Sequence, residues 1–294
     1  MEGTDRKMGF ESLQGIVDLC REKGFDFARA VRYLEHRTSG LAEESQYHRM
    51  RFLWQTMLEA SSHYEPELRS ASGLSGGDGE KFRIYARDKS SLCGVFISQV
   101  IAEALKMAES NACMKRIVAS PTAGSCGILP AVLIPLYGRG DVPEAHIVES
   151  LFVAAGIGQV IASRASISGA EGGCQAEIGS ASAMAAGSLV FLRGGSAGQI
   201  AYAAGYALQN LLGLVCDPVG GLVEVPCVKR NVIGAVNALS AADMALAGIV
   251  PKIPADEVID AMRAVGRKMD PSLRETGTGG IAAAPTAARY RVEV

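Results

Sequence analysis

The sequence lacks the features of a nucleic-acid-binding or secreted protein. Its 29 Lys and Arg residues are balanced by 31 Asp and Glu residues, and no block of basic residues offsets the formal net charge of -2. Because a phosphate backbone is bound by a basic surface, we expect no nucleic-acid partner. The first 15 residues have neither the apolar core nor the small-residue cleavage site of a secretory signal, which favours a cytoplasmic location.

The sequence also lacks a strong membrane-spanning run. Its longest uncharged stretch, residues 194–215, contains Gln199, Gln209, Asn210 and several glycines. A bilayer span needs about 20 predominantly apolar residues with stronger hydrophobicity than this. We therefore predict a buried helix in this stretch and no membrane contact.

Strand-like alternation of apolar and polar residues is nearly absent, which predicts an all-α fold. Apolar residues recur at helical spacing in residues 13–20 and again in residues 41–64, and a further helix is expected over residues 91–114. We expect a compact bundle of Ala/Gly-rich helices with the site built from the loops between them. Residues 1–70 would form a helical arm packed on the core, and residues 71–294 a helical catalytic domain continuous with it.

Four loops carry the residues that chemistry needs. They are SGAEGGCQAEIGS (168–180), CDPVGGLVEVPC (216–227), SPTAGSCGILP (120–130) and RETGTGG (274–280). Each supplies bare backbone amides together with hydroxyls, carboxylates or thiols, and loops that converge from several helices commonly line a pocket.

We expect no disulfide framework, because the seven cysteines are an odd number and no signal peptide leads to an oxidising compartment. Cys174 follows two glycines, where backbone can approach a bulky group closely. Cys216 and Cys227 enclose a segment with two prolines and two glycines that cannot be a continuous helix and could fold back on itself. Thiolates suit zinc or an iron–sulfur cluster, yet the spacing matches no common zinc knuckle. Spacing alone is equally consistent with metal binding and with buried structural cysteines.

Longer motifs carry a family resemblance. The stretches SGLSGGDG, ESNACMKRIVASPTAGSCGILPA, EGGCQAEIGSASAMAAG, CDPVGGLVEVPCVKRN and ETGTGGIAAAPT occur in this order between about residues 70 and 287. With them the chain resembles the α chain of the bacterial iron–sulfur L-serine dehydratases. The resemblance implies a 4Fe–4S cluster held by Cys174, Cys216 and Cys227, with one iron left open. Cys126 in GSCGILP is the runner-up ligand, and its alternative is a small residue at a helix start.

The resemblance implies a lyase that deaminates L-serine to pyruvate and ammonia. An open iron would act as a Lewis acid on the departing hydroxyl oxygen, while a base removes the α-proton. The base is not assigned, since all four histidines lie outside the matching loops. The loop candidates are Lys115, Glu171, Glu177 and Glu224, and the hydroxyl candidates are Ser125 and Thr276.

A substrate carboxylate needs N–H donors and positive potential, which glycine-rich turns at helix starts provide. The turns SGGDG and AGSCG predict contacts from Gly76, Gly77, Gly124 and Ser125. The alternative is that these glycines only permit tight turns.

The resemblance also implies a separate β chain, because no SSSHT-like stretch of the β portion is present. The terminal RYRVEV has no cysteine that could reach the open iron, from which we expect an air-sensitive cluster. Two other functions stay open: a related cluster enzyme acting on L-cysteine or L-threonine, and a non-catalytic cluster- or zinc-binding subunit. A pyridoxal-phosphate enzyme is disfavoured, since Lys115, Lys229 and Lys252 lack a fitting context.

Overall fold

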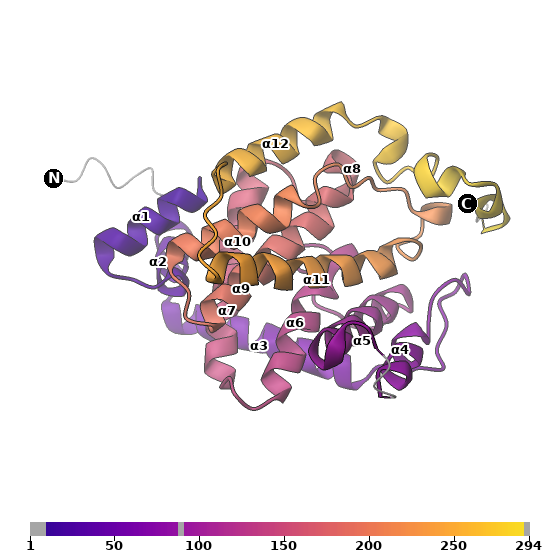
Figure 1. Ribbon diagram of the computed structural model, residues 1–294, viewed down its shortest axis with the longest axis horizontal. Helices are drawn as coiled ribbons and strands as arrows, with labels where there is room; N and C mark the ends of the chain where they lie inside the picture. The colour runs from indigo at the N-terminus through magenta and orange to yellow at the C-terminus, as the bar shows by residue number, and fades with distance from the viewer. Residues whose placement is uncertain (1–9, 88–90, 291–294) are drawn as a thin grey trace.

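The computed structural model describes residues 10–87 and 91–290. Within these ranges the chain forms helices and loops with no β-strand, which confirms the all-α prediction (Figure 1). Residues 1–9 lie outside the described residues, and with them most of the segment considered for a secretory signal. Residues 291–294, the end of RYRVEV, lie outside them as well. The α-helices are α1 (Leu13–Lys23), α2 (Phe27–Ser39), α3 (Glu43–Ser62), α4 (Asp78–Arg87), α5 (Gly94–Ala112), α6 (Ile128–Gly138), α7 (Glu144–Arg164), α8 (Gly169–Gly172), α9 (Ser180–Leu192), α10 (Ala197–Gln209), α11 (Cys227–Leu246) and α12 (Ala255–Lys268).

Short helical turns join these helices at the four predicted loops and near the C-terminus. They are η2 (Ala123–Ser125), η3 (Gln175–Gly179), η4 (Val219–Gly221), η5 (Pro271–Leu273), η6 (Gly280–Ala283) and η7 (Pro285–Tyr290). The η3 turn is a π-helix, and π-turns occur frequently at functional sites.

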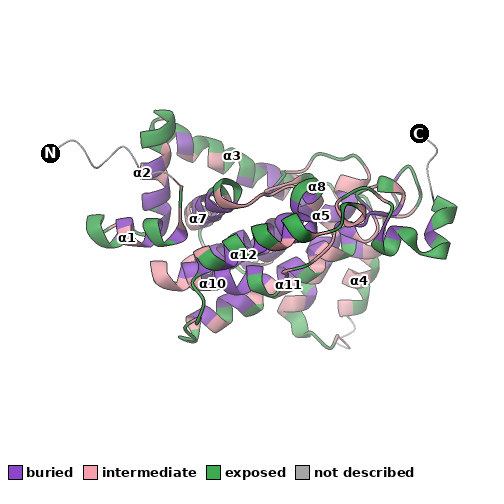
Figure 2. Cartoon of the chain, turned by 90° about the horizontal axis from the view of Figure 1, so that it is seen from above, coloured by how far each residue is buried: buried purple, intermediate pink, exposed green. Residues whose placement is uncertain are grey.

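Helix α9 lies at the centre and packs against α7, α10 and α11. Its residues are almost all buried, and most are Ala, Ser or Gly, so neighbouring backbones can approach closely. At Gly187 a β-carbon would lie 2.2 Å from the Cδ1 atom of Ile157 in α7, so a larger residue there would require the Ile157 side chain to move. Seen from above, buried residues follow α7 and α10, whereas exposed residues collect on the outer faces of α1 and α12 (Figure 2).

The N-terminal helices share the core of the larger part. Leu13, Ile16 and Trp54, none more than 1% exposed, belong to one apolar cluster with residues of α7, α9 and α10. Leu53, which follows the same helical spacing, is instead 39% exposed. The division at residue 70 stays a prediction, although the apolar core crosses it without a break.

Local sequence signals set several helix ends. The Ser12 hydroxyl accepts a hydrogen bond from the Gly15 amide at the start of α1, and Gly24, at φ 66°, ends the helix in the left-handed region. Helix α4 was not expected from the sequence pattern. It begins at Asp78, inside the glycine-rich break of residues 72–79, and residues 91–114 contain α5 as a slightly shorter helix than predicted.

The uncharged stretch of residues 194–215 forms the buried helix predicted for it, α10, whose 13 residues are too few to span a bilayer. In the described part of the chain one helix, α7, is long and apolar enough for a span. Of its most apolar window, 67% is buried inside the protein, as in a helix at the centre of a core.

Candidate active site

Three loops bring buried thiols to one place. Cys174 directly precedes η3, Cys216 lies in the segment after α10, and Cys227 is the first residue of α11; each is at most 7% exposed. The ligand atoms of Cys174, Cys216 and Glu177 all lie within 4.8 Å of one another. Cys227 stands outside that tight group but close enough to interact electrostatically with both other thiols. Sequence reasoning thus selected cysteines that the fold places together.

The three thiols differ in how readily they lose a proton. A hydrogen bond from the Cys216 thiol, assisted by the charge of Arg230, holds the pKa of Cys174 below its ordinary value in spite of burial. The same hydrogen bond and burial raise the pKa of Cys216. Burial, and then the Cys174 charge, raise the pKa of Cys227 to about 12. Burial and the charge of a neighbouring thiolate oppose ionisation of Cys216 and Cys227, so three thiolates would need a bound cation to hold them.

Arg230 supplies the positive charge nearest the thiols. Its Nη1 atom lies 3.5 Å from the Sγ of Cys174 and 2.7 Å from the carbonyl oxygen of Val215, to which it donates. Its Nη2 atom forms an ion pair of 2.8 Å with Asp217. The guanidinium therefore connects the first turn of α11 to the segment that carries Cys216, and it offsets negative charge at the sulfurs.

Glycines allow side chains to approach the backbone closely beside the thiols. A β-carbon at Gly169 would lie 2.6 Å from Oε2 of Glu177 and 3.1 Å from Sγ of Cys216, and one at Gly124 would lie 3.3 Å from Oε1 of Glu177. Soft sulfur donors gathered in this way suit a thiophilic metal such as zinc or an iron–sulfur cluster. The residues present therefore fit the group that the resemblance implies.

Glu177 projects from η3 into the same region. Its Oε1 atom accepts a hydrogen bond of 2.7 Å from the Thr122 hydroxyl. Burial raises the pKa of its carboxyl group above the ordinary value, the hydrogen bond from Thr122 opposes this, and the charge of Glu275 adds to it. Among the base candidates taken from the sequence, Glu177 is the carboxylate that lies against the thiols.

Asn231, which sequence reasoning missed, ties the 120–130 loop to α11. Its Oδ1 atom accepts from the Gly127 amide at 2.9 Å, and its Nδ2 atom donates to the carbonyl oxygens of Gly124 at 2.8 Å and Cys227 at 3.0 Å. The side chain is 1% exposed. The amide that directly follows CVKR in the sequence, ahead of small and apolar residues, was the available signal.

The two hydroxyl candidates have different surroundings. Ser125 is fully buried, and its hydroxyl bonds to Thr122 and to the carbonyl oxygen of Ser120 within the η2 capping turn. Thr276 is exposed and donates to the carbonyl oxygen of Ser272 at 3.0 Å. Its loop nevertheless begins against the site, because the Glu275 amide donates to the Cys216 carbonyl oxygen.

Cys126, the runner-up ligand, lies outside the group formed by Cys174, Cys216 and Glu177. It is 1% exposed, its thiol lies 3.7 Å from the carbonyl oxygen of Met107, and burial raises its pKa to about 12. These surroundings match the alternative interpretation, a small residue near a helix start.

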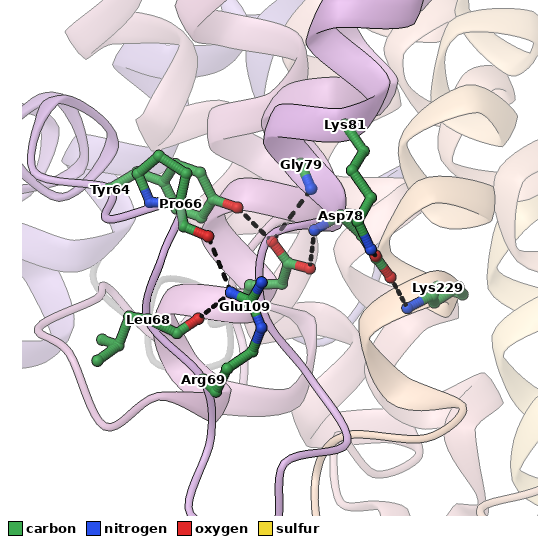
Figure 3. Close-up of polar contacts among 9 residues, drawn as sticks. All are labelled: Tyr64, Pro66, Leu68, Arg69, Asp78, Gly79, Lys81, Glu109 and Lys229. Atoms are coloured by element: carbon green, nitrogen blue, oxygen red, sulfur yellow. Dashed lines mark hydrogen bonds and ion pairs between the residues drawn. The ribbon is translucent and has the colours of Figure 1, made fainter.

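The SGGDG turn meets a carboxylate of the chain itself. Figure 3 shows the Glu109 carboxylate at the start of α4, where it accepts from the amides of Asp78 at 2.8 Å and Gly79 at 3.1 Å and from the Tyr64 hydroxyl at 2.6 Å. The first amides of this helix are therefore already satisfied. At Gly76, with φ 128°, a β-carbon would lie 2.2 Å from the carbonyl oxygen of Leu68, so tight chain approach accounts for that glycine. A role of Gly76 and Gly77 in substrate binding stays a prediction.

The segment that leads into this turn is hydrogen-bonded to the cysteine loop of residues 216–227. The hydroxyls of Ser70 and Ser72 donate to the buried Glu224 carboxylate at 2.6 and 2.9 Å. Lys229 forms an ion pair of 2.7 Å with Asp78. Glu224 therefore holds two loops together, a structural use that its sequence position did not reveal.

The remaining candidates lie away from the thiols. Lys115 is exposed and paired with Glu65, and Glu171 is exposed and lines a pocket that none of the three cysteines lines. The histidines lie on the surface or are half-buried, as expected from their helices; they are His36, His48, His63 and His146.

An all-α fold with buried cysteines converging from separate loops defines a helical protein with a thiol site suited to a soft metal. Comparison with known families makes the assignment specific: residues 22–282 match the family model described as serine dehydratase alpha chain, and the chain belongs to this family. The resemblance seen in the sequence motifs is thereby confirmed.

Individual relatives agree with the family. The chain is 44% identical over 277 residues to the probable L-serine dehydratase, alpha chain, of Bacillus subtilis, covering 94% of this chain and 92% of the relative. It is 40% identical over 277 residues to the L-serine dehydratase, alpha chain, of Peptoniphilus asaccharolyticus, covering 94% and 95%. It is 36% identical over 284 residues to the L-serine dehydratase of Helicobacter pylori, covering 93% of this chain and 61% of the relative.

Proposed function

We propose that the chain is the α subunit of an L-serine dehydratase that converts L-serine to pyruvate and ammonia in the cytoplasm. The observation that carries this proposal is the convergence of Cys174, Cys216 and Glu177 within 4.8 Å in a member of this family. The relatives from Bacillus subtilis and Peptoniphilus asaccharolyticus, both described as alpha chains of L-serine dehydratase, support the substrate and the subunit.

A 4Fe–4S cluster held by Cys174, Cys216 and Cys227 is the proposed cofactor. Support comes from the burial of the three thiols, the adjacent Arg230 guanidinium and the glycines that let Glu177 and Cys216 approach the backbone closely. Bound through three cysteines, such a cluster supplies an iron with an open position that acts as a Lewis acid on the departing hydroxyl oxygen. A fourth cysteine ligand would remove that position, and Cys126 is accordingly not included.

The chain's own residues would hold the substrate and exclude water. Gly124 and Ser125 are the proposed carboxylate contacts, because Asn231 and Thr122 fix their turn beside the Glu177 carboxylate. Ser125 and Thr276 remain the proposed hydroxyl groups for proton transfer. Burial of the thiols and of Ser125 keeps bulk water from the reacting atoms, which strengthens electrostatic interactions in the site.

A separate β chain is the proposed partner. Relatives described as alpha chains match this chain over nearly their full length, whereas the relative from Helicobacter pylori extends well beyond the matched part. We infer that a second polypeptide provides what the longer relative carries in one chain.

The test is to produce the chain with its β partner under anaerobic conditions and to compare Cys174→Ala with the matched control Cys126→Ala. We expect the wild type and Cys126→Ala to contain iron, to absorb broadly in the visible range and to release pyruvate from L-serine, with activity and colour lost together in air. Cys174→Ala should lose iron and activity. Parallel assays with L-threonine and L-cysteine identify the substrate class.

Three results would contradict the proposal. A colourless, zinc-loaded protein without turnover would indicate a non-catalytic metal-binding subunit. Activity that survives air but is abolished by borohydride would indicate pyridoxal phosphate. Equal iron content in Cys174→Ala and wild type would remove this cysteine from the ligand set.

A further inference from the structure

A pocket lies between the end of α7, the short α8 and α12. It has a volume of about 220 Å³, and its lining includes the side chains of Arg164, Arg263, Arg267 and Glu171. Helix α12 packs directly against α8, and a β-carbon at Gly266 would lie 3.0 Å from the Cα of Gly172. The pocket is therefore formed where α12 meets the segment that leads into Cys174.

The three arginines of this pocket differ in the number of hydrogen-bond partners that they have. Arg164 forms two bonds to Asp260, at 3.2 and 2.6 Å, and a third bond of 3.0 Å to the Glu11 carbonyl oxygen. Arg263 makes a single bond of 3.4 Å to the Arg164 carbonyl oxygen, and Arg267 has no partner among the described residues. Glu171, the one carboxylate of the lining, forms no ion pair within 4.0 Å with any described guanidinium or amine. Two guanidinium groups with unused N–H donors thus face a small polar cavity.

We propose that this pocket binds a small oxyanion, a carboxylate or a phosphate, through Arg263 and Arg267. Guanidinium groups match the geometry of both anions and can bind them in bidentate fashion. With Arg164 neutralised by Asp260, the remaining lining carries two positive charges against the single negative charge of Glu171. The balance favours an anion, and it predicts that Glu171 opposes its binding.

The pocket is connected to the thiol site through Gln175. This residue is 1% exposed, lines the pocket and directly follows Cys174 in the chain. Its Nε2 atom donates to the Met262 carbonyl oxygen of α12 at 3.0 Å, and its Oε1 atom accepts from the Gly213 amide at 2.9 Å. Its own amide donates to the carbonyl oxygen of Leu214, two residues before Cys216. Arg263 directly follows Met262, so an anion held by Arg263 and Arg267 would fix the part of α12 that Gln175 contacts and would hold the Cys174 and Cys216 segments against opening; this coupling rests on the proposed function of the thiols, whereas anion binding does not.

The binding test uses the full chain and titration calorimetry at constant ionic strength, with inorganic phosphate in one series and acetate in the other. Arg267→Gln should weaken binding about tenfold, as expected for loss of one charge-assisted contact, and Glu171→Gln should strengthen it. Lys268→Gln is the matched control, because it removes one positive charge from the exposed face of the same helix outside the pocket. The anion whose affinity depends on Arg267 identifies the ligand class.

The proposal is overturned if neither anion binds, if Arg267→Gln binds like the wild type, or if Lys268→Gln weakens binding equally. Coupling is tested on metal-free protein by the rate at which a thiol reagent modifies the buried cysteines. Phosphate or acetate at ten times its dissociation constant should slow the reaction about tenfold in the wild type but not in Arg267→Gln. An unchanged rate in the wild type would refute the connection through Gln175, and since no turnover is measured, neither test depends on the dehydratase activity.

Discussion

Replacement of Asn231 by alanine should destabilise the protein by an amount that its contacts allow to be worked out. The substitution leaves the Gly127 amide and the Gly124 carbonyl oxygen without their side-chain partner, while the Cys227 carbonyl oxygen keeps its place in the α11 helix. Gly127 is buried, so loss of its partner costs about 1–3 kcal/mol. Gly124 is only half-buried and can recruit water, which limits its share to about 1 kcal/mol.

We therefore expect Asn231→Ala to lower the free energy of unfolding by about 2–4 kcal/mol, measured by urea unfolding of the metal-free chain. The free energy of unfolding of Asn231→Asp should lie between those of the wild type and Asn231→Ala, because aspartate keeps an acceptor for the Gly127 amide and loses both donated bonds. Asn210→Ala, which removes one exposed bond to Asn237, is the control and should change stability by less than about 0.5 kcal/mol. If Asn231→Ala unfolds like this control, the side chain does not hold the loop as inferred.

Three further substitutions test the site and its supports. Gly169→Ala should lower the iron content of anaerobically prepared protein by crowding the neighbouring carboxylate and thiol, while Gly138→Ala, with nothing within 4 Å of the added carbon, should leave it unchanged; equal iron in both would remove the steric argument. Glu109→Gln should lower the free energy of unfolding by about 1–2 kcal/mol, because a neutral amide caps the start of α4 less well, and unaltered urea unfolding would show that the charge is dispensable. The hydrogen bond from Lys229 lowers the pKa of Asp78, so its stabilisation is present above the unfolded value of 3.8 and is lost as pH falls; Asp78→Asn should be less stable than wild type at pH 7, and the difference should shrink at pH 3. A difference that persists at pH 3 would point to packing rather than charge.

Helix content could be predicted because it depends on local signals, whereas the choice of cysteines came from the family motifs and stays a prediction. Residues 13–20 show a helical apolar face, and the prolines and glycines between Cys216 and Cys227 prevent a continuous helix. The long motifs then separated Cys174, Cys216 and Cys227 from the other cysteines. The start of α4 at Asp78 was missed because a Gly-Gly turn precedes it and its stabilising carboxylate comes from Glu109.

The roles of individual polar residues could not be predicted in the same way. Glu177 and Glu224 looked equivalent in the sequence, as two carboxylates in neighbouring motifs. In the fold Glu177 lies against two thiols, whereas Glu224 is taken up by Ser70 and Ser72 from a distant loop. The difference comes from partners more than 150 residues away in the case of Glu224, and no local pattern encodes them.

The sequence by itself determined that the chain is helical, that it carries the motifs of its family and which thiols form the candidate ligand set, since composition, periodicity and motif order are properties of the chain alone. Only the tertiary structure decided that Arg230 faces Cys174, that Asn231 forms hydrogen bonds with the 120–130 loop, and that the Glu109 carboxylate caps the start of α4. Arg230 and Asn231 are neighbours on α11 but contact different loops, and Glu109 of α5 contacts the start of α4. The packing of small residues around α9 sets their distances, and that packing exists only once the helices have assembled.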